Sequence, residues 1–289
     1  MSYLVVGAGG ALGRDIVAAL AGRDVTALSR AQLDVTDADA VTSAVDAGYD
    51  VIVNASAYTR VDDAESNEDE ARAANATAVA NLARAAASTS ATLVQISTDY
   101  VFDGSATTPY AEDSELGPVS VYGRTKAEGE QLALALNPGR TFVVRTAWLY
   151  GENGANFVKT VLQLAETRDQ LSVVTDQIGQ PTWTRDLAAQ IVLLLDSGAP
   201  AGIYHGTSSG QCSWYEFARA VFSEAGFDAN RVRPTDSSQF VRPAARPAYS
   251  VLGHASWAAA GMAPMRDWRT ALTDAFSAGG LARGAQTTP

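Results

Sequence analysis

Short apolar runs alternate with longer segments of helical periodicity through residues 1–150. The runs are rich in Val, Ile and Leu, which is typical of strands buried on both faces of a parallel sheet. The predicted strands are residues 3–6, 24–28, 50–54, 92–96 and 141–145, and the predicted helices are 11–20, 37–47 (N-cap Thr36), 68–87 and 121–136. This alternation predicts an α/β fold, a Rossmann-type doubly wound parallel sheet with helices on both faces.

The alternation loosens after residue 150, which predicts a second, smaller part of the molecule. The predicted helices there are 157–165, 185–195 and 214–225, and the predicted strands are 171–174 and 202–205. Residues 227–250 indicate long loops, and the small, polar tail 279–289 is expected to fray. We expect a dinucleotide-binding domain at 1–150, with return segments near 183–206, and a smaller C-terminal substrate-binding lobe formed by 151–182 and 207–289.

The composition narrows the class of protein. The 289 residues carry a formal net charge of −11, which argues against general binding to nucleic acid or to anionic membranes. The single cysteine, Cys212, excludes an intramolecular disulfide scaffold. No run approaches the ~20 apolar residues of a membrane-spanning helix, and the first residues lack the basic region of a signal peptide. A soluble, cytoplasmic protein is the expectation.

A glycine-rich loop follows the first predicted strand and precedes the first predicted helix. Glycines let the backbone turn tightly and approach a pyrophosphate at the helix N-terminus. An ordinary turn is the alternative, but the strand–loop–helix setting favours a dinucleotide site. The expected cofactor contacts in this loop are Gly7, Gly9, Gly10, Ala11, Leu12 and Gly13.

The end of the second predicted strand bears on the choice of cofactor. An NAD-preferring site carries an acidic residue here for the ribose hydroxyls, whereas this chain has Ser29 and Arg30. A hydroxyl and a guanidinium suit a 2′-phosphate, so we expect NADPH, with NADH as the alternative. Asp34 and Val35 follow, where they could meet the adenine, and a solvated turn is the competing interpretation.

A tyrosine and a lysine, Tyr122 and Lys126, are spaced so that they share one face of the fourth predicted helix. A neighbouring ammonium favours the ionised phenol, and such a tyrosine can give a proton to a ketone oxygen. Thr98 follows a core strand at the edge of the sheet where ligands bind, and its hydroxyl could bond the same oxygen. The competing interpretations are a surface Tyr–Lys pair and a capping threonine.

These features resemble the extended short-chain dehydrogenases and, more closely, the dTDP-4-dehydrorhamnose reductase family. The resemblance covers roughly residues 3–275. It rests on the long strings 53–62, 97–104, 121–126, 145–151 and 176–182, and on Arg246, Pro247, Ser250 and Leu252. It implies NADPH-dependent reduction of the C4 ketone of dTDP-4-dehydro-L-rhamnose to dTDP-L-rhamnose.

The resemblance also implies roles for individual residues. Thr98, Tyr122 and Lys126 would form the catalytic set, with Tyr122 beside the cofactor and Lys126 holding its nicotinamide ribose. The further residues along the cofactor would be Asn54, Ala55 and Ala57, and Asn75 would be structural. The residues that would face the sugar nucleotide are Thr59, Val61, Asp99, Tyr100 and Trp148. Without the family, Trp148 could equally be a core residue.

Assembly, metal use and two rival functions stay open at this point. Some family members form a magnesium-linked dimer, so a homodimer is one expectation. An acid is expected directly after the glycine loop in those members, but this chain has Arg14 before Asp15, which puts magnesium in doubt, and we assign no metal ligand. The rivals are a nucleotide-sugar epimerase or dehydratase of the same superfamily and a non-catalytic regulatory subunit. The intact catalytic set argues against the regulatory subunit.

Overall fold

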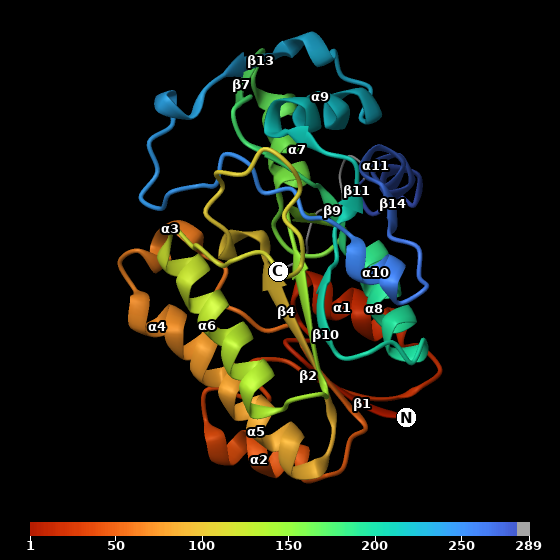
Figure 1. Ribbon diagram of the computed structural model, residues 1–289. Coiled ribbons are helices and arrows are strands. Elements are labelled where there is room, and N and C mark those ends of the chain that lie inside the picture. The colour runs from red at the N-terminus through yellow and green to blue at the C-terminus, as the bar shows by residue number, and fades with distance from the viewer. Residues whose placement is uncertain (282–289) are drawn as a thin grey trace.

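A six-stranded parallel sheet forms the centre of the larger part of the molecule (Figure 1). The computed structural model describes residues 1–281. The strands are β1 (Ser2–Val6), β2 (Asp24–Leu28), β3 (Val51–Asn54), β4 (Thr92–Thr98), β5 (Thr141–Thr146) and β10 (Gly202–His205). They lie in the order β10-β5-β4-β3-β1-β2. The predicted doubly wound parallel sheet is confirmed.

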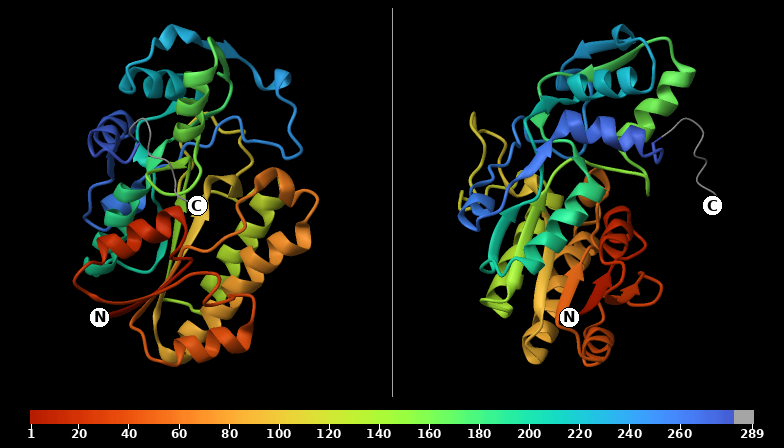
Figure 2. Two further views of the ribbon diagram at one scale, coloured as in Figure 1. Left: turned by 180° about the vertical axis from the view of Figure 1, so that it is seen from behind. Right: turned by 90° about the vertical axis from the view of Figure 1, so that its right-hand side faces the viewer.

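Helices cover both faces of this sheet (Figures 1 and 2). One face carries α2 (Ala38–Val45), α5 (Ala78–Thr89) and α6 (Val121–Leu136), and the other carries α1 (Ala11–Ala19) and α8 (Thr184–Asp196). Alternate residues of β1 face opposite layers. Leu4 and Val6 pack with α2 and α5, whereas Tyr3 and Val5 pack with α1 and α8. Burial of both faces explains why the strands read as uninterrupted apolar runs.

The long helix after β3 is not regular. Predicted as one helix over 68–87, it consists of α4 (Glu68–Arg72), a π-helical turn (Ala73–Thr77) and α5. Such turns often occur at functional sites. Here the turn carries the buried Asn75, whose amide exchanges hydrogen bonds with the backbone of Tyr58 and donates to the Thr125 hydroxyl. The turn thereby ties the segment after β3, which contains the short helix α3 (Val61–Ala64), to α6.

The smaller lobe, at the top of both views in Figure 2, packs around a separate apolar core. Phe217, Val161 and Leu272 lie fully buried in it. The helices in this part of the chain are α7 (Phe157–Thr167), α9 (Trp214–Glu224), α10 (Ala255–Ala259) and α11 (Trp268–Ser277), and the strands are β6 (Leu149–Tyr150), β7 (Leu171–Val174), β8 (Ile178–Gly179), β9 (Thr182–Trp183), β11 (Ser208–Ser209), β12 (Cys212–Ser213), β13 (Val232–Thr235) and β14 (Met265–Asp267). Helix α10 instead packs toward the sheet, because its Trp257 contacts Tyr204 of β10.

Three local expectations are corrected. Helix α2 is capped by Asp37, whose carboxylate accepts from two backbone N–H groups, because the hydroxyl of Thr36 is already bonded to Asp34. The segment expected to be loop at 227–250 contains β13, which pairs with β7. Its Pro234 is tolerated because β13 lies at a sheet edge. In the tail expected to fray, Leu281 is buried in the lobe core, and residues 282–289 lie outside the described residues.

The chain reverses its direction of travel across the sheet after β2. Strand β1 pairs with β2 on one side and with β3 on the other. In open parallel sheets, ligands bind at the carboxyl ends of the strands at such a switch point. The loops that leave β1 and β3 there are residues 7–10 and 55–60. The fold therefore places the glycine loop at the binding edge.

Candidate active site

The glycine loop runs from β1 to the N-terminus of α1. Gly7 has a φ of 73°, and a Cβ built on it would lie 2.6 Å from the backbone nitrogen of Ser56. Gly10 is the N-cap of α1, so no side chain bonds the N–H groups of the first helical turn. Those groups and the positive end of the helix dipole suit a phosphate. The loop therefore has the backbone approach and the donors that a dinucleotide pyrophosphate requires.

A first cavity, of about 420 Å³, lies on one side of the glycine loop. The predicted cofactor residues on its walls are Gly7, Gly9, Gly10, Ser29, Arg30, Asp34, Val35, Ala55 and Ala57. The Asp34 carboxylate accepts from the backbone and hydroxyl of Thr36, and these bonds hold the pKa of Asp34 below its usual range. Arg30 is exposed at the rim, where a guanidinium can meet a phosphate.

Two predicted cofactor residues, Gly13 and Asn54, line neither this cavity nor the next. A Cβ on Gly13 would overlap the backbone oxygen of Gly7, so this glycine lets α1 approach the loop. Asn54 is fully buried; it donates to Gln95 at 2.7 Å and accepts from the backbone of Ser56 at 3.0 Å. Asn54 thus shapes the turn that carries Ala55 and Ala57.

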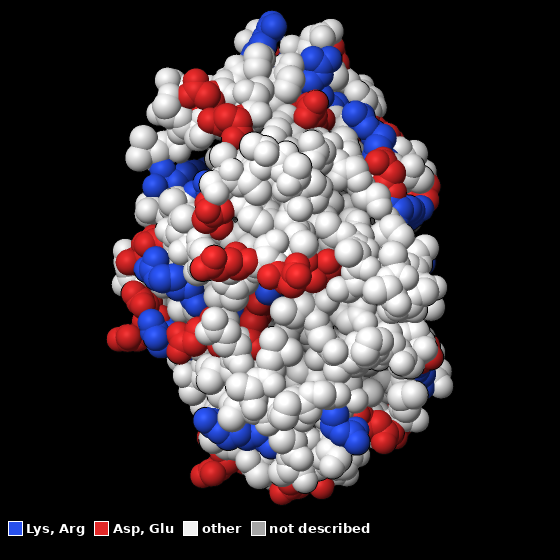
Figure 3. Space-filling view, in the orientation of Figure 1, with Lys and Arg blue, Asp and Glu red and all other residues white. Residues whose placement is uncertain are grey.

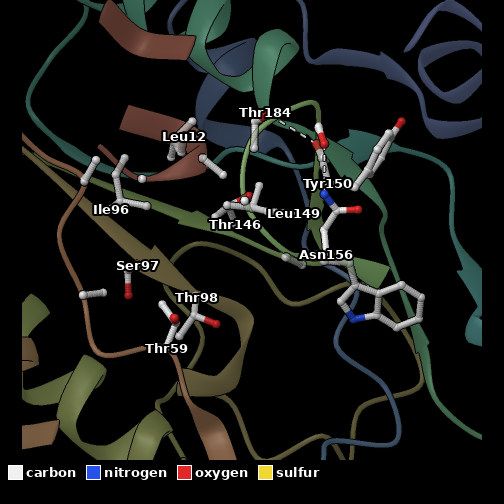
Figure 4. Close-up of a pocket in the computed structure, with 18 of the residues that line it drawn as sticks. Leu12, Thr59, Ile96, Ser97, Thr98, Thr146, Leu149, Tyr150, Asn156 and Thr184 are labelled. Atoms are coloured by element: carbon white, nitrogen blue, oxygen red, sulfur yellow. Dashed lines mark hydrogen bonds between the residues drawn. The ribbon is translucent and has the colours of Figure 1, made fainter. Parts of the chain in front are cut away.

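A second cavity, of about 570 Å³, continues from the glycine loop toward the smaller lobe. Gly10, Ala55, Ser56 and Ala57 line both cavities. The other predicted residues on its walls are Ala11, Leu12, Thr59, Val61, Thr98, Asp99, Tyr100, Tyr122, Lys126 and Trp148. Figure 4 shows Thr59 and Thr98 on one side of this cavity and Tyr150 and Asn156 on the other. The structure therefore brings the predicted catalytic and substrate-facing residues together.

Tyr122 and Lys126 both belong to α6, and both line the second cavity. Lys126 is buried, and its Nζ donates to the backbone oxygen of Ile96 at 2.6 Å. Burial lowers the pKa of Lys126 to about 8, against the opposing charge of Glu130. Burial also raises the pKa of Tyr122 to about 12. The expected lowering of the phenol pKa is therefore wrong, because burial raises that pKa instead. Tyr122 stays protonated at neutral pH, as a proton donor must be.

Thr98 has the capping role that the sequence left open, and its hydroxyl also lines the second cavity. It is the N-cap of the short 3₁₀ turn Asp99–Val101, and it accepts from the backbone of Tyr100. Its hydroxyl donates to Oδ1 of Asp99 at 2.9 Å, and burial raises the pKa of Asp99 to about 6. Because a hydroxyl has one proton, Thr98 can donate to a ketone oxygen only by releasing Asp99.

Three further polar groups on the cavity wall are buried and have no hydrogen-bond partner in the described part of the chain. They are the hydroxyls of Ser97, Thr146 and Tyr150. Buried polar groups are normally paired, so these atoms mark a wall built for a polar ligand. Ser97 and Thr146 were not predicted as site residues. Both lie in strings that carry the family resemblance, Ser97 in 97–104 and Thr146 in 145–151, and both stand at the ends of core strands, which is the signal that could have found them.

A third cavity, of about 730 Å³, lies in the smaller lobe and was missed by sequence reasoning. Tyr100 lines both this cavity and the second one. Aromatic and aliphatic walls are combined with arginines, and the main contributors are Phe157, Leu171, Trp214, Arg168, Arg242 and Arg246. Arg246 also pairs with Asp62 of α3, with Nη2 2.8 Å from Oδ2. The three cavities thus follow one another from the glycine loop into the lobe.

Trp148 stands at the boundary between the second and third cavities. Its ring is half-buried and stacks on Trp214, with ring centroids 3.5 Å apart and planes 8° from parallel. It lines the second cavity and also packs against the lobe core. The two interpretations of Trp148, cavity wall and core residue, are therefore not exclusive.

Known proteins are similar in sequence to this chain over nearly its whole length. A family model described as the RmlD substrate binding domain matches residues 1–279. A dTDP-4-dehydrorhamnose reductase of Streptomyces griseus is 48% identical over 283 residues, which cover 96% of this chain and 93% of the relative. The chain belongs to the dTDP-4-dehydrorhamnose reductase family. A second relative is the dTDP-4-keto-6-deoxy-D-glucose reductase of Streptomyces niveus. It is 48% identical over 277 residues, which cover 95% of this chain and 96% of the relative.

A solved structure shares the fold of this reductase family member. The dTDP-4-dehydrorhamnose reductase of Bacillus anthracis, in complex with NADP, superposes with a TM-score of 0.93. It is 38% identical and covers 96% of this chain and 100% of its own. The glycine loop and the first cavity described above fit such a dinucleotide in this chain as well.

The surface of this reductase family member carries both signs of charge. On the face in Figure 3, Lys and Arg lie scattered among Asp and Glu rather than in one basic patch. Within residues 1–281, no helix has the length and apolar character needed to cross a bilayer. In the same residues, no group of three or more His, Cys, Asp or Glu side chains is placed to hold a metal ion.

Proposed function

We propose that this protein reduces the C4 ketone of dTDP-4-dehydro-L-rhamnose to dTDP-L-rhamnose with NADPH. The observation that carries the proposal is the convergence of Thr98, Tyr122 and Lys126 on the cavity that joins the glycine loop to the lobe. The names of both relatives reported above describe reduction of a dTDP-linked 4-keto sugar.

NADPH bound along the glycine loop supplies a hydride to C4 of the sugar. Tyr122 then gives its phenolic proton to the oxygen, which completes the alcohol. Thr98 holds the same oxygen once its hydroxyl leaves Asp99, and two aligned donors stabilise the charge that develops there. Lys126, anchored on Ile96, holds the nicotinamide ribose and places a positive charge behind the phenol.

Cofactor choice rests on the rim of the first cavity. Ser29 and exposed Arg30 line that cavity beside the glycines, without an acidic residue at the end of β2. A guanidinium there favours a 2′-phosphate by a charge-assisted bond. Asp34 is held in a turn by Thr36, so its contribution is to the shape of the adenine pocket.

The nucleotide of the substrate would lie in the third cavity, with the sugar in the second. Phe157 and Leu171 offer apolar surface for a base, and Arg168, Arg242 and Arg246 offer positive charge for a diphosphate. Tyr100, which lines both cavities, would lie where the diphosphate joins the sugar. Thr59, Val61, Asp99 and Trp148 would surround the sugar itself.

The chain divides between these two tasks. We assign 1–150 with 183–206 to the dinucleotide, because α8 and β10 of the return segment complete the first core. We assign 151–182 and 207–289 to the substrate, with α10 joining the lobe to the sheet. The reaction belongs in the cytoplasm, where NADPH and nucleotide sugars are supplied. Light scattering on the purified protein tests whether it works as a homodimer.

The test is a panel of 4-keto deoxy nucleotide sugars. Purified protein is mixed with NADPH and each dTDP-linked 4-keto-6-deoxy sugar in turn, absorbance of the reduced cofactor is followed, and each product is identified. Oxidation of added NADPH with formation of dTDP-L-rhamnose is expected. Turnover without added cofactor, with redox-neutral isomerisation or dehydration, would favour the epimerase or dehydratase instead. Preference for a different 4-keto sugar would change the substrate but keep the reaction.

A further inference from the structure

The backbone of Trp148 is strained. Among residues 1–281, Trp148 and Ser90 are the non-glycine residues with a positive φ, and φ at Trp148 is 47°. Ser90 ends α5, where a left-handed residue is ordinary. Trp148 instead follows the end of β5, and a bulky side chain in this region is held there only by its surroundings. The contacts that hold it are therefore informative about the site.

Trp214 supplies a flat surface for the Trp148 ring. The two indoles stack face to face at 3.5 Å, and the ring of Phe157 lies 4.5 Å from that of Trp214. Trp214 is itself fixed, because it is the first residue of α9. A reciprocal pair of hydrogen bonds between Ser213 and Glu216 caps that helix.

Gly179 supplies the space for the same ring. A Cβ built on Gly179 would lie 2.5 Å from Cε2, 2.6 Å from Cζ2 and 2.8 Å from Nε1 of Trp148. Gly179 pairs with Cys212 in the β8–β12 ladder, and Cys212 lies two residues before Trp214 in the chain. The β8–β12 ladder therefore places both Gly179, which leaves space for the ring, and Trp214, which stacks on it.

We propose that Trp214 and Gly179 are positioning residues that set the ring of Trp148 against the reacting sugar, and that they determine how well the enzyme accepts a deoxysugar. This rests on the proposed function. The ring gives the second cavity an apolar wall, which suits a C–H face or methyl group. Because residues of the lobe hold this ring, a change in the packing of the lobe would shift the wall of the second cavity.

The first test is spectroscopic and needs no substrate. Stacked indoles couple and give an exciton couplet in the far-ultraviolet circular dichroism. The wild-type protein is expected to show it, and Trp214→Phe and Gly179→Ala are expected to lose or change it. Trp268→Phe is the matched control, because Trp268 belongs to the same lobe core but lines none of the three cavities. A couplet that persists in Trp214→Phe contradicts the stacked pair.

The second test is a double-mutant cycle with NADPH and the sugar nucleotide. Trp214→Ala is expected to lower kcat/KM for the sugar nucleotide by about 10- to 100-fold, the scale of an ångström of misplacement. KM for NADPH should stay unchanged, and Trp214→Phe should recover most of the loss. In a Trp148→Ala background the same change should have little further effect, because Trp214 acts through Trp148.

The outcomes separate the two proposals. Additive losses in the cycle, or normal kinetic constants for folded Trp214→Ala, overturn the positioning role while the reductase function stands. A wild-type protein that shows the couplet but does not reduce any 4-keto sugar overturns the proposed function. Gly179→Ala gives an independent check, since Trp148 supplies its nearest clashes. If that variant keeps both the couplet and wild-type kcat/KM, the space under Trp148 is not needed and the proposal fails.

Discussion

The ammonium of Lys126 donates a hydrogen bond of 2.6 Å to the backbone oxygen of Ile96. This bond joins α6 to the end of β4 just before Ser97 and Thr98. It fixes the helix that carries Tyr122 relative to the strand that carries Thr98. The two donors proposed for the ketone oxygen therefore come from different elements, and the Lys126–Ile96 bond connects those elements.

The first prediction concerns the proton donor. Tyr122→Phe keeps the ring and removes the phenolic proton, so kcat should fall by about 10²–10⁴-fold, the usual contribution of general acid catalysis. Binding of NADPH, followed by cofactor fluorescence, should change little. Tyr215→Phe, in α9 of the lobe, is the control and should keep kcat. An unchanged kcat in Tyr122→Phe would remove this residue from the mechanism.

The second prediction concerns pH and stability. The pKa of Lys126 is lowered to about 8 in the folded protein from an ordinary value of 10.5. Between these values the unfolded chain binds more protons at this site, so its contribution makes folding more favourable as pH rises through that window. Urea unfolding at pH values across the window should show this rise in the wild type relative to Lys126→Met. Equal pH dependence in the two proteins would show that Lys126 titrates normally.

The third prediction concerns the cofactor. Arg30→Ala should weaken NADPH by about 10-fold or more, the loss expected for one bond to a charged group, and should leave NADH nearly unchanged. Isothermal titration with both cofactors measures this. Arg84→Ala on α5 is the control, because Arg84 is exposed and lines none of the cavities. Equal weakening of both cofactors by Arg30→Ala would rule out a 2′-phosphate contact.

The fourth prediction concerns the wall of the second cavity. Trp148→Ala should raise KM for the sugar nucleotide and leave KM for NADPH unchanged. Because the ring is half-buried, the stability loss should be smaller than the ~3–5 kcal/mol of a fully buried tryptophan. Trp257→Ala, at a fully buried position, should show the opposite pattern in thermal unfolding and kinetics. A destabilised Trp148→Ala with normal kinetic constants would leave it a core residue only.

The sequence was most informative for candidate site residues that follow the ends of strands. Runs of apolar residues predicted the strands, and the loops after β1 and β3 and the end of β4 then had to meet at one edge. The helical spacing of Tyr122 and Lys126 placed both on one face. These local rules were enough to predict that the glycine loop and the proposed catalytic residues lie together.

The remaining features depend on contacts between distant segments. The third cavity is built from α7, α9 and residues 240–246, which meet only through packing of the lobe. The left-handed backbone of Trp148 requires Trp214 and Gly179, and neither neighbour is visible from the residues around Trp148. The raised pKa of Tyr122 follows from burial, which the spacing of Tyr122 and Lys126 in the sequence does not reveal.

Transfer of deuterium tests the central claim most directly. NADPH carrying deuterium at the transferable position of the nicotinamide is incubated with the protein and dTDP-4-dehydro-L-rhamnose, and the product is analysed by mass spectrometry and NMR. We predict one deuterium per product, located at C4 of dTDP-L-rhamnose, with oxidised cofactor formed in equal amount. Product without deuterium at C4, or with deuterium at another carbon, would contradict the account.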